Sequence, residues 1–475
     1  MTPSYTSLRQ IQADLRAGIT TCETLVSQYL NRIEASRQLN IYIEVFADEA
    51  ISKARALDAR FRENPESVGR LFGMVLSLKD VICYEGHSAT AGSRILEGFR
   101  SPYSATAVER LLAEDVIVIG RVNCDEFAMG STNETSCYGP TRNAADETRI
   151  PGGSSGASAV AVQADTCLAS LGSDTGGSVR QPAAFCGVVG MKPTYGRISR
   201  HGLIAYGSSF DQIGTLTHSV EDAALLLEIM AGKDEYDSTS SLQEVTPYSQ
   251  QLNFDRKAKI AYFSAALEHP SLAPDVKAAC DSLIARLRAE GHEVEAVDFE
   301  YLDYIIPAYY VLTTAEASSN LSRYDGVRYG RRSTEAHTLD DLYRKSRTEG
   351  FGPEVQRRIV LGTFVLSAGY YDAYYGKAQR VRRLIHDRTA EILSTHDFIL
   401  LPAAPGGPWK LGETIDDPVA MYLADIFTVQ ANMAGIPAIC IPVGKHDDGM
   451  PMGIQFMAGK FCESDLLAFA QLLHP

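Results

Sequence analysis

The sequence predicts an α/β fold, in which a largely buried β-sheet is covered by helices within a single large domain. Short apolar runs of strand length alternate with segments of helical periodicity along the chain. Several of the strand-like runs are continuously apolar, as is typical of sheets buried on both faces. The 475 residues are 45% hydrophobic and 22% charged, and they show no internal repeat and no strong domain boundary.

Residues 1–65 are predicted to be helical. Apolar residues recur at helical spacing from Leu8 to Ile33, and Gly18 interrupts them. Thr20 and Thr21 can cap the second of the two helices. A third helix is predicted at about 49–62. The sequence therefore predicts an N-terminal helical segment ahead of the sheet.

Residues 66–235 are predicted to form the catalytic core. The apolar run 71–78 has the length of a strand and ends at Lys79. A helix at 105–113 and a buried strand at 116–122 are expected to follow.

Residues 152–214 are rich in Gly, Ser and Thr, but short apolar pieces interrupt them. This pattern indicates ordered loops on a scaffold rather than a flexible linker, and such loops often carry function.

The remaining chain continues the alternation of helices and strands. The predicted elements are a helix at 221–230, a strand at 259–263, a helix at about 274–290, a tyrosine-rich helical layer at about 301–382 and a strand at 398–402.

Charge and cysteine content restrict the class of protein. The formal net charge of −15 argues against this chain binding a nucleic-acid backbone by itself. The nine cysteines form no CxxC pair, which argues against a zinc site or a disulfide framework, so we expect no metal. No run approaches the roughly 20 apolar residues that span a bilayer, and the N-terminus lacks the features of a signal peptide. We therefore expect a cytoplasmic protein that does not enter a membrane.

The glycine-rich segment 172–178 ends at a candidate nucleophile, Ser178. It matches neither the P-loop nor the dinucleotide-binding motif. The small residues Thr175, Gly176 and Gly177 can direct backbone N–H groups at the oxyanion of a tetrahedral intermediate beside that serine. The alternative is a tight turn whose glycines adopt positive φ.

A serine nucleophile needs a base, and Lys79 is the candidate. It ends an apolar strand, where burial would lower the pKa of its amine towards neutrality. The alternative is an ordinary ion pair with Asp80. Ser154 could relay a proton between Lys79 and Ser178, although a serine before a helix is commonly only an N-cap.

A Ser-His-Asp hydrolase is a weaker hypothesis. Residues 152–156 match the GxSxG pattern, but residues 148–151 do not form the strand that this motif requires. No histidine lies in a recognisable catalytic context.

Three motifs together resemble the amidase signature family: Pro151–Gly156, Gly172–Gly187 and Gly190–Arg197. The serines at 154 and 178 are 24 residues apart, as in that family. Ala157 departs from the pattern, because many members have glycine there. The resemblance implies a large mixed sheet covered by helices on both faces. It also implies Ser178 as nucleophile, Lys79 as base, Ser154 in a cis peptide as the bridge, and the amides of residues 175–177 as the oxyanion hole.

Within this family, the stretches 123–130, 206–214, 315–330 and 369–375 resemble the A subunits of tRNA-dependent amidotransferases, and the likeness runs from about Leu8 to Phe461. The resemblance implies a glutamine site in which Arg358 holds the α-carboxylate, Asp425 holds the α-ammonium group and Tyr309 adds a hydroxyl. Opposite charges at the two ends would select a zwitterion. The alternative is that Arg358 and Asp425 are surface charges on helices.

The resemblance also implies a glutaminase that works in a heterotrimeric complex. Ammonia released from glutamine would pass to the B subunit, which, with the small C subunit, would convert Glu-tRNA(Gln) to Gln-tRNA(Gln) using ATP and Mg²⁺. This chain would need no cofactor and would meet tRNA only through the complex. The alternatives are a stand-alone amidase for another small amide and a scaffolding subunit with a vestigial site.

Overall fold

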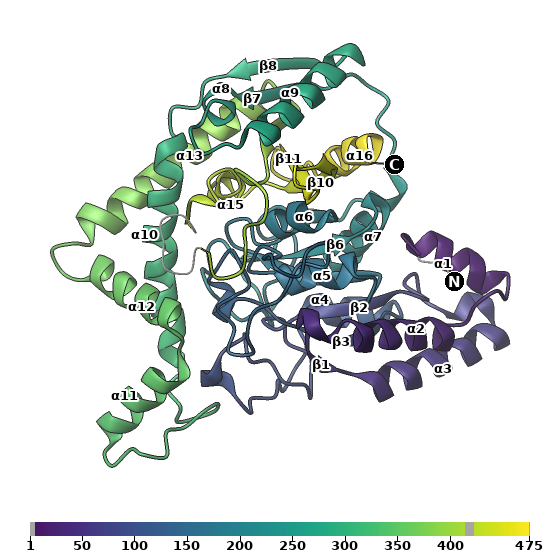
Figure 1. Ribbon diagram of the computed structural model, residues 1–475, viewed down its shortest axis with the longest axis horizontal. Helices are drawn as coiled ribbons and strands as arrows, with labels where there is room; N and C mark the ends of the chain where they lie inside the picture. The colour runs from purple at the N-terminus through teal and green to yellow at the C-terminus, as the bar shows by residue number, and fades with distance from the viewer. Residues whose placement is uncertain (1–4, 414–421, 475) are drawn as a thin grey trace.

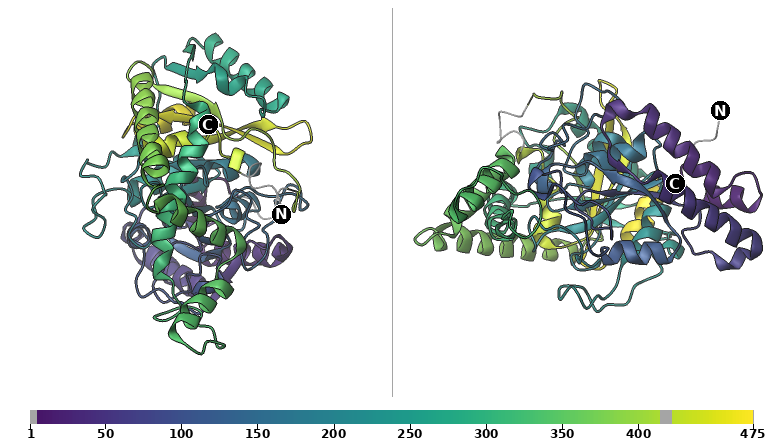
Figure 2. Two further views of the ribbon diagram at one scale, coloured as in Figure 1. Left: turned by 90° about the vertical axis from the view of Figure 1, so that its left-hand side faces the viewer. Right: turned by 90° about the horizontal axis from the view of Figure 1, so that it is seen from below.

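A mixed β-sheet forms the centre of the protein, and helices lie on both sides of it (Figures 1 and 2). The computed structural model describes residues 5–413 and 422–474. In this part of the chain the sheet has 11 strands, in the order β1-β3-β2-β4-β6-β5-β10-β11-β9-β7-β8. The predicted α/β class, with one large sheet in a single domain, is confirmed.

The strands are β1 (Tyr42–Val45), β2 (Val75–Lys79), β3 (Ile117–Val122), β4 (Ala169–Asp174), β5 (Val189–Lys192), β6 (Gln212–Thr217), β7 (Lys259–Phe263), β8 (Glu293–Val297), β9 (Phe398–Pro402), β10 (Ala438–Lys445) and β11 (Pro451–Ala458). The α-helices are α1 (Leu8–Arg16), α2 (Cys22–Ala35), α3 (Ala47–Glu63), α4 (Thr106–Ala113), α5 (Gly156–Gln163), α6 (Arg180–Cys186), α7 (Val220–Met230), α8 (Ser264–Leu267), α9 (Pro274–Ala289), α10 (Leu302–Asn320), α11 (Leu339–Gly350), α12 (Pro353–Leu366), α13 (Lys377–Leu393), α15 (Val429–Ala434) and α16 (Glu463–Leu473).

Parallel pairing sets the position of the site. Strand β2 pairs in parallel with both β3 and β4, so the carboxyl ends of these three strands meet at one edge of the sheet. Every residue of the three strands is buried, as expected for parallel strands of a sheet that is covered on both faces. Lys79 at the end of β2 and the glycine-rich segment after β4 therefore lie side by side.

The predicted strand at 71–78 is partly wrong. Leu71 to Met74 form a turn, in which the Met74 N–H donates to the Leu71 carbonyl at 2.8 Å, and β2 begins only at Val75. Leu71 and Met74 are nevertheless fully buried. The apolar run therefore indicates burial here rather than a strand along its whole length. The turn at Gly73, whose φ is +91°, delays the start of the strand to Val75.

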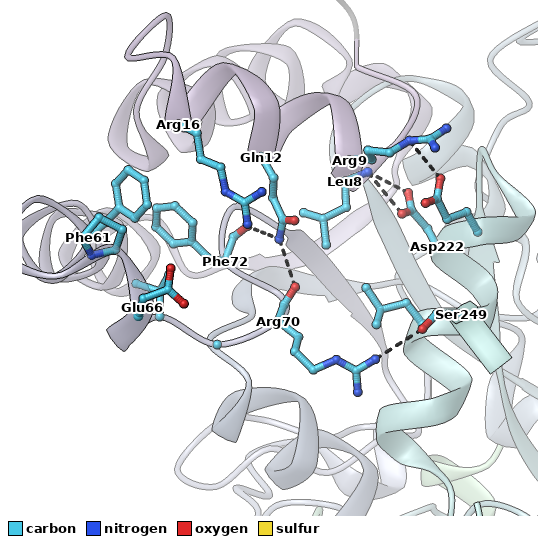
Figure 3. A pocket seen from close by; sticks show the side chains of 15 residues that line it. Leu8, Arg9, Gln12, Arg16, Phe61, Glu66, Arg70, Phe72, Asp222 and Ser249 are labelled. Atoms are coloured by element: carbon cyan, nitrogen blue, oxygen red, sulfur yellow. Dashed lines mark hydrogen bonds and ion pairs between the residues drawn. The ribbon is translucent and has the colours of Figure 1, made fainter. Parts of the chain in front are cut away.

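The N-terminal helices attach to the core through α1. The Leu8 N–H donates to both carboxylate oxygens of Asp222 on α7, at 3.1 and 3.2 Å (Figure 3). The Gln12 side-chain amide donates to the carbonyls of Arg70 and Phe72, at 3.0 and 3.2 Å (Figure 3). Burial raises the pKa of Asp222 to about 7. As predicted, Thr21 caps α2, where its side chain accepts from the Thr24 N–H.

Helices α10 to α13 stand along one side of the molecule, opposite α1 to α3 (Figure 1). Helices α10 and α13 pack over a second hydrophobic cluster, which includes Ile305, Leu312 and Ile385 and extends to β7 and β9. None of the helices in the described ranges is both long enough and apolar enough to cross a membrane.

Candidate active site

The amine of Lys79 lies among three serine hydroxyls at the end of β2. It donates to Oγ of Ser154 at 2.7 Å, of Ser155 at 2.8 Å and of Ser173 at 2.9 Å. Lys79 is fully buried, and this burial lowers the pKa of its ammonium group to about 8. A substantial neutral fraction is therefore present at physiological pH, as a general base requires.

The alternative ion pair between Lys79 and Asp80 is wrong. Successive side chains on a strand point to opposite faces, and the Asp80 carboxylate accepts instead from the Thr90 and Gly92 N–H groups, at 3.1 and 2.8 Å. It lies 3.7 Å from Nε of Arg121 on β3. The Lys79 amine thus makes its hydrogen bonds to hydroxyls, and no carboxylate of the described ranges binds it.

Ser154 follows a cis peptide bond from Gly153. The residue at the N-cap of α5 is Ser155, whose side chain makes no capping hydrogen bond, and the Ala157 N–H of the first turn donates to Oδ1 of Asn133 at 2.9 Å. The alternative role of Ser154 as a helix cap is therefore wrong. Its hydroxyl is directed to Lys79 instead.

Ser178 lies between β4 and α6, beside the 154–155 segment. Its carbonyl accepts from the Ser155 N–H at 3.1 Å. Its hydroxyl makes no hydrogen bond to any residue in 5–413 or 422–474, including Ser154, and the residue is 8% exposed. The structure thus joins Lys79 directly to Ser154 and places Ser178 next to them with its hydroxyl free.

The backbone amides around the end of the glycine-rich segment differ in their partners. Those of Thr175, Gly176 and Ser178 donate to no described residue. The Gly177 N–H, in contrast, donates to Oδ1 of Asp174 at 2.9 Å. Three amides are therefore available to an oxyanion, and Gly177 would have to leave Asp174 to contribute a fourth.

Close packing explains the glycine at 177. This residue has φ +131°, and a Cβ atom built on it would lie 2.1 Å from Oγ1 of Thr428. The same threonine hydroxyl donates to the Gly176 carbonyl at 2.7 Å. Thr428, which precedes α15, therefore packs against the glycine-rich segment and fixes it by a hydrogen bond.

We expect Gly177→Ala to lower the free energy of unfolding by roughly 2–4 kcal/mol, because both the positive φ and the clash with Thr428 oppose a side chain there. Urea unfolding of the purified variant measures this loss. Gly18→Ala is the matched control: Gly18 has φ +69° with nothing within 4 Å of a built Cβ, so a loss of only about 1 kcal/mol is expected. Equal losses in the two variants would contradict the packing argument.

A buried ion pair anchors the glycine-rich segment. The guanidinium of Arg180 on α6 donates to both carboxylate oxygens of Asp174, each at 3.0 Å. Burial acts to raise the pKa of Asp174, but the charge and hydrogen bonds of Arg180, together with Lys192 and Asn432, outweigh it and hold this pKa at about 2. Arg180 also donates to the Thr428 carbonyl and to Gln455 on β11, both at 2.8 Å. No local pattern in the sequence indicates this role, because the partners at 428 and 455 are distant along the chain.

Arg358 on α12 is buried, with 2% of its surface exposed, so the alternative of a surface charge is wrong. Its Nε donates to Glu354 at 2.8 Å and its Nη1 to the Tyr206 hydroxyl at 2.7 Å. The rings of Tyr206, Tyr310 and Tyr422 lie within 5.5 Å of the guanidinium carbon. Its Nη2 donates to no described residue. One edge of the guanidinium is therefore fixed by the protein, and the other can meet a ligand.

Asp425 is also buried, with 7% of its surface exposed. Its Oδ2 accepts from the Ser131 hydroxyl at 2.8 Å, whereas its Oδ1 is buried and has no hydrogen-bond partner in the described part of the chain. Burial raises the pKa of this carboxyl to about 7. A buried carboxylate oxygen without a partner is costly, and a bound ammonium group would satisfy it.

Tyr309 and Asp425 both reach the glycine-rich segment. A Cβ atom built on Gly176 would lie 2.5 Å from the Tyr309 hydroxyl. The Asp425 carbonyl accepts from the Thr428 N–H at 3.0 Å, and Thr428 in turn holds Gly176. The structure therefore places Tyr309 directly beside Gly176 and links Asp425 to Gly176 through Thr428. Within the described ranges no group of three or more His, Cys, Asp or Glu side chains could hold a metal ion.

Ser131 and Glu354 were not foreseen as parts of the site. Ser131 belongs to a loop that is organised by Asp125, whose carboxylate accepts from the N–H groups of residues 132–135 at 2.8–3.3 Å. Asp125 falls in one of the stretches that carried the resemblance, which was the only available signal.

Comparison with known proteins agrees with this geometry. The Amidase family model matches residues 24–467. The A subunit of glutamyl-tRNA(Gln) amidotransferase from Chlorobium phaeobacteroides is 50% identical over 470 residues, which cover 99% of this chain and 98% of that protein. Its counterpart of the same name from Koribacter versatilis is 50% identical over 456 residues, which cover 95% and 94%.

Solved structures show the same fold. The crystal structure of the glutamyl-tRNA(Gln) amidotransferase A subunit from Thermotoga maritima is 39% identical, with a TM-score of 0.76 over 94% of this chain and 90% of that one. The native peptide amidase from Stenotrophomonas maltophilia is 30% identical, with a TM-score of 0.82 over 98% and 96%. The chain therefore belongs to the amidase family and, within it, to the family of glutamyl-tRNA(Gln) amidotransferase A subunits.

Proposed function

We propose that this chain is the glutamine-hydrolysing subunit of a tRNA-dependent amidotransferase, with Ser178 as its nucleophile. The observation that best supports this is the fully buried Lys79 amine, 2.7 Å from Ser154 and beside the free hydroxyl of Ser178. A lysine with a lowered pKa and a relaying serine replace the histidine of other serine hydrolases.

The reaction begins with attack of Ser178 Oγ on the side-chain amide carbon of glutamine. The Ser178 proton moves to Ser154, and the Ser154 proton moves to neutral Lys79. The oxyanion accepts hydrogen bonds from the backbone amides of Thr175 and Gly176, and from that of Gly177 once it leaves Asp174. Lys79 then returns a proton through Ser154 to the leaving nitrogen, so that ammonia departs and a glutamyl ester remains on Ser178. Water hydrolyses this ester to glutamate by the same relay.

Two opposite charges orient the substrate. The free edge of Arg358 binds the α-carboxylate of glutamine, and Oδ1 of Asp425 accepts from its α-ammonium group. The Tyr309 hydroxyl contacts the bound molecule beside Gly176. Both charged groups are buried, and each keeps one polar atom without a partner in the described ranges, Nη2 of Arg358 and Oδ1 of Asp425, which favours a zwitterionic ligand.

The division of the chain follows this chemistry. Residues 66–235 carry the catalytic groups, the helical layer at about 301–382 carries two of the substrate-binding residues, and residues 1–65 support the core from outside. The ammonia passes to the partner B and C subunits in the cytoplasm. There ATP and Mg²⁺ are used to convert Glu-tRNA(Gln) to Gln-tRNA(Gln), and this chain meets tRNA only through the complex.

A covalent adduct tests the proposed function. When the complex is mixed with glutamine and quenched in acid, intact-mass measurement is expected to show this chain carrying one glutamyl group, because the acyl-enzyme is an obligatory intermediate. Ser178→Ala should carry none. The absence of an adduct with any amide would favour a vestigial site, and adduct formation with simple neutral amides but not with glutamine would favour a stand-alone amidase.

A further inference from the structure

The loop from Tyr206 to Asp211, between β5 and β6, contacts both ends of the proposed glutamine site. Its last residue, Asp211, is buried and accepts three hydrogen bonds. Oδ1 accepts from the Thr175 hydroxyl at 2.7 Å and from the Gly207 N–H at 3.1 Å. Oδ2 accepts from the Tyr206 N–H at 2.9 Å. The Asp211 carboxylate thus joins the loop to Thr175, the first of the residues proposed for the oxyanion hole.

Tyr206 carries the connection to the other end of the site. Its hydroxyl accepts from Nη1 of Arg358 at 2.7 Å, and its ring centroid lies 5.5 Å from the guanidinium carbon. Because Glu354 holds Nε of the same side chain at 2.8 Å, Tyr206 and Glu354 together fix the direction of the guanidinium plane. The residue whose N–H binds Asp211 therefore also orients the group that holds the α-carboxylate.

The rest of the loop is held firmly by the helical layer. The ring of Phe210 meets Tyr309 edge-on at 5.7 Å, and the guanidinium of Arg382 lies 3.9 Å from its centroid. Arg382 donates to the hydroxyl and the carbonyl of Ser209, at 2.7 and 2.8 Å. Because these contacts fix the loop, a displacement of one of its residues also displaces the others.

We propose that Asp211 is a positioning residue that sets the distance between the oxyanion amides and the carboxylate-binding arginine. It holds Thr175 directly and Arg358 through Tyr206, so a glutamine bound by its α-carboxylate presents its side-chain amide at the correct depth beside Ser178. Displacements of about 1 Å in such arrangements cost up to about 100-fold in rate. This inference rests on the proposed function, because it needs a substrate that carries both groups.

Three substitutions test the contact to Thr175 and the contact to Arg358, separately and together. Thr175→Val removes the hydroxyl but keeps the amide, and we expect it to lower kcat about tenfold while changing KM less than threefold. Tyr206→Phe removes the acceptor of Arg358, and we expect it to raise KM for glutamine about tenfold while changing kcat less than threefold. Asp211→Asn should both lower kcat and raise KM. Whichever way the amide turns, its NH₂ group faces an N–H or O–H donor and loses a hydrogen bond that the carboxylate made.

Two control variants test for simple loosening of the structure. Ser208→Ala lies in the same loop and removes a hydrogen bond to Asn320 on α10, but touches neither Thr175 nor Arg358. Asp222→Asn changes another buried carboxylate, which accepts from the Leu8 N–H at the start of α1. Both controls are expected to keep kcat and KM within twofold of wild type, even where their melting temperatures fall.

The decisive measurement is a double-mutant cycle in steady-state glutamine hydrolysis, with the full chain purified together with its partner subunits. Thr175→Val should lower kcat about tenfold in the Asp211 background but less than threefold once Asp211→Asn is present. Tyr206→Phe should likewise lose most of its effect on KM in that background. Additive effects, or an Asp211→Asn variant that loses only thermal stability as Asp222→Asn does, would overturn the inference. If wild type fails to hydrolyse glutamine, the proposed function is wrong as well, so the two failures are distinguishable.

Discussion

Lys79→Met is expected to slow acylation of Ser178 by glutamine roughly 10⁴-fold at pH 7.5. Methionine fills a similar volume but cannot accept a proton, so the hydroxyls of Ser154 and Ser178 would have no base. Single-turnover mixing followed by acid quench and intact-mass measurement gives the acylation rate directly. A variant that acylates within tenfold of wild type would show that another group is the base.

Lys192→Met is the matched control. Lys192 is equally buried, and burial lowers the pKa of its amine to about 7, but it donates to the carbonyls of Pro193 and Ile436 and to Gln212. No hydroxyl of the proposed relay is among its partners. The variant should lose stability yet acylate within about threefold of wild type per folded molecule.

The pH dependence gives an independent check on the base. The pKa of Lys79 lies at about 8 in the folded protein, lowered from its ordinary value by burial. The amine must be neutral to accept a proton, so the acylation rate should be low below pH 8, rise through it and level off above it. A rate that falls across this range would contradict Lys79 as the base.

The sequence carried enough information to place the catalytic residues but not their neighbours. Lys79 at the end of an apolar strand and two serines in glycine-rich loops are local patterns, and the structure brings their segments together. The commitment of the Gly177 N–H to Asp174 depends on loop geometry that a spacing pattern does not contain. The contact between Ser131 and Asp425 joins residues 294 positions apart. Long-range contacts of this kind follow from the sheet order rather than from any single segment.

Strand prediction succeeded where a short apolar run had the same length as the strand. The predicted strands at 259–263 and 398–402 have the bounds found for β7 and β9. Strands β10 and β11 were not among the predicted elements, because their sequences contain residues typical of loops. Pro442 and Gly444 lie where the β10–β11 register shifts, and Gly453 packs so closely that a Cβ atom built on it would lie 2.7 Å from Sγ of Cys440. In β10 and β11, pairing with the neighbouring strand therefore outweighs the preference of the local sequence for a loop.

Arg358→Leu is expected to lower kcat/KM for glutamine about 10³-fold, since it removes the buried charge that would pair with the α-carboxylate. Propionamide has no α-carboxylate, so its slower hydrolysis should change less than threefold. Arg357→Leu is the control: this neighbour on the same helix is 46% exposed, binds Glu354 alone among the described residues and should leave both substrates within threefold of wild type. Equal losses for glutamine and propionamide would indicate structural damage rather than lost recognition.

We expect the titration of Asp425 to make KM for glutamine depend on pH. Burial raises the pKa of its carboxyl to about 7 in the free site, so it is charged above this pH and neutral below it. Only the charged form attracts an ammonium group, and KM for glutamine should therefore rise as the pH falls through 7, whereas KM for propionamide should not. Asp425→Asn should raise KM for glutamine above pH 7, to about the value that wild type shows at low pH, and abolish this dependence. If the dependence persisted in Asp425→Asn, the titrating group would be another residue, and Asp425 would not be the ammonium site.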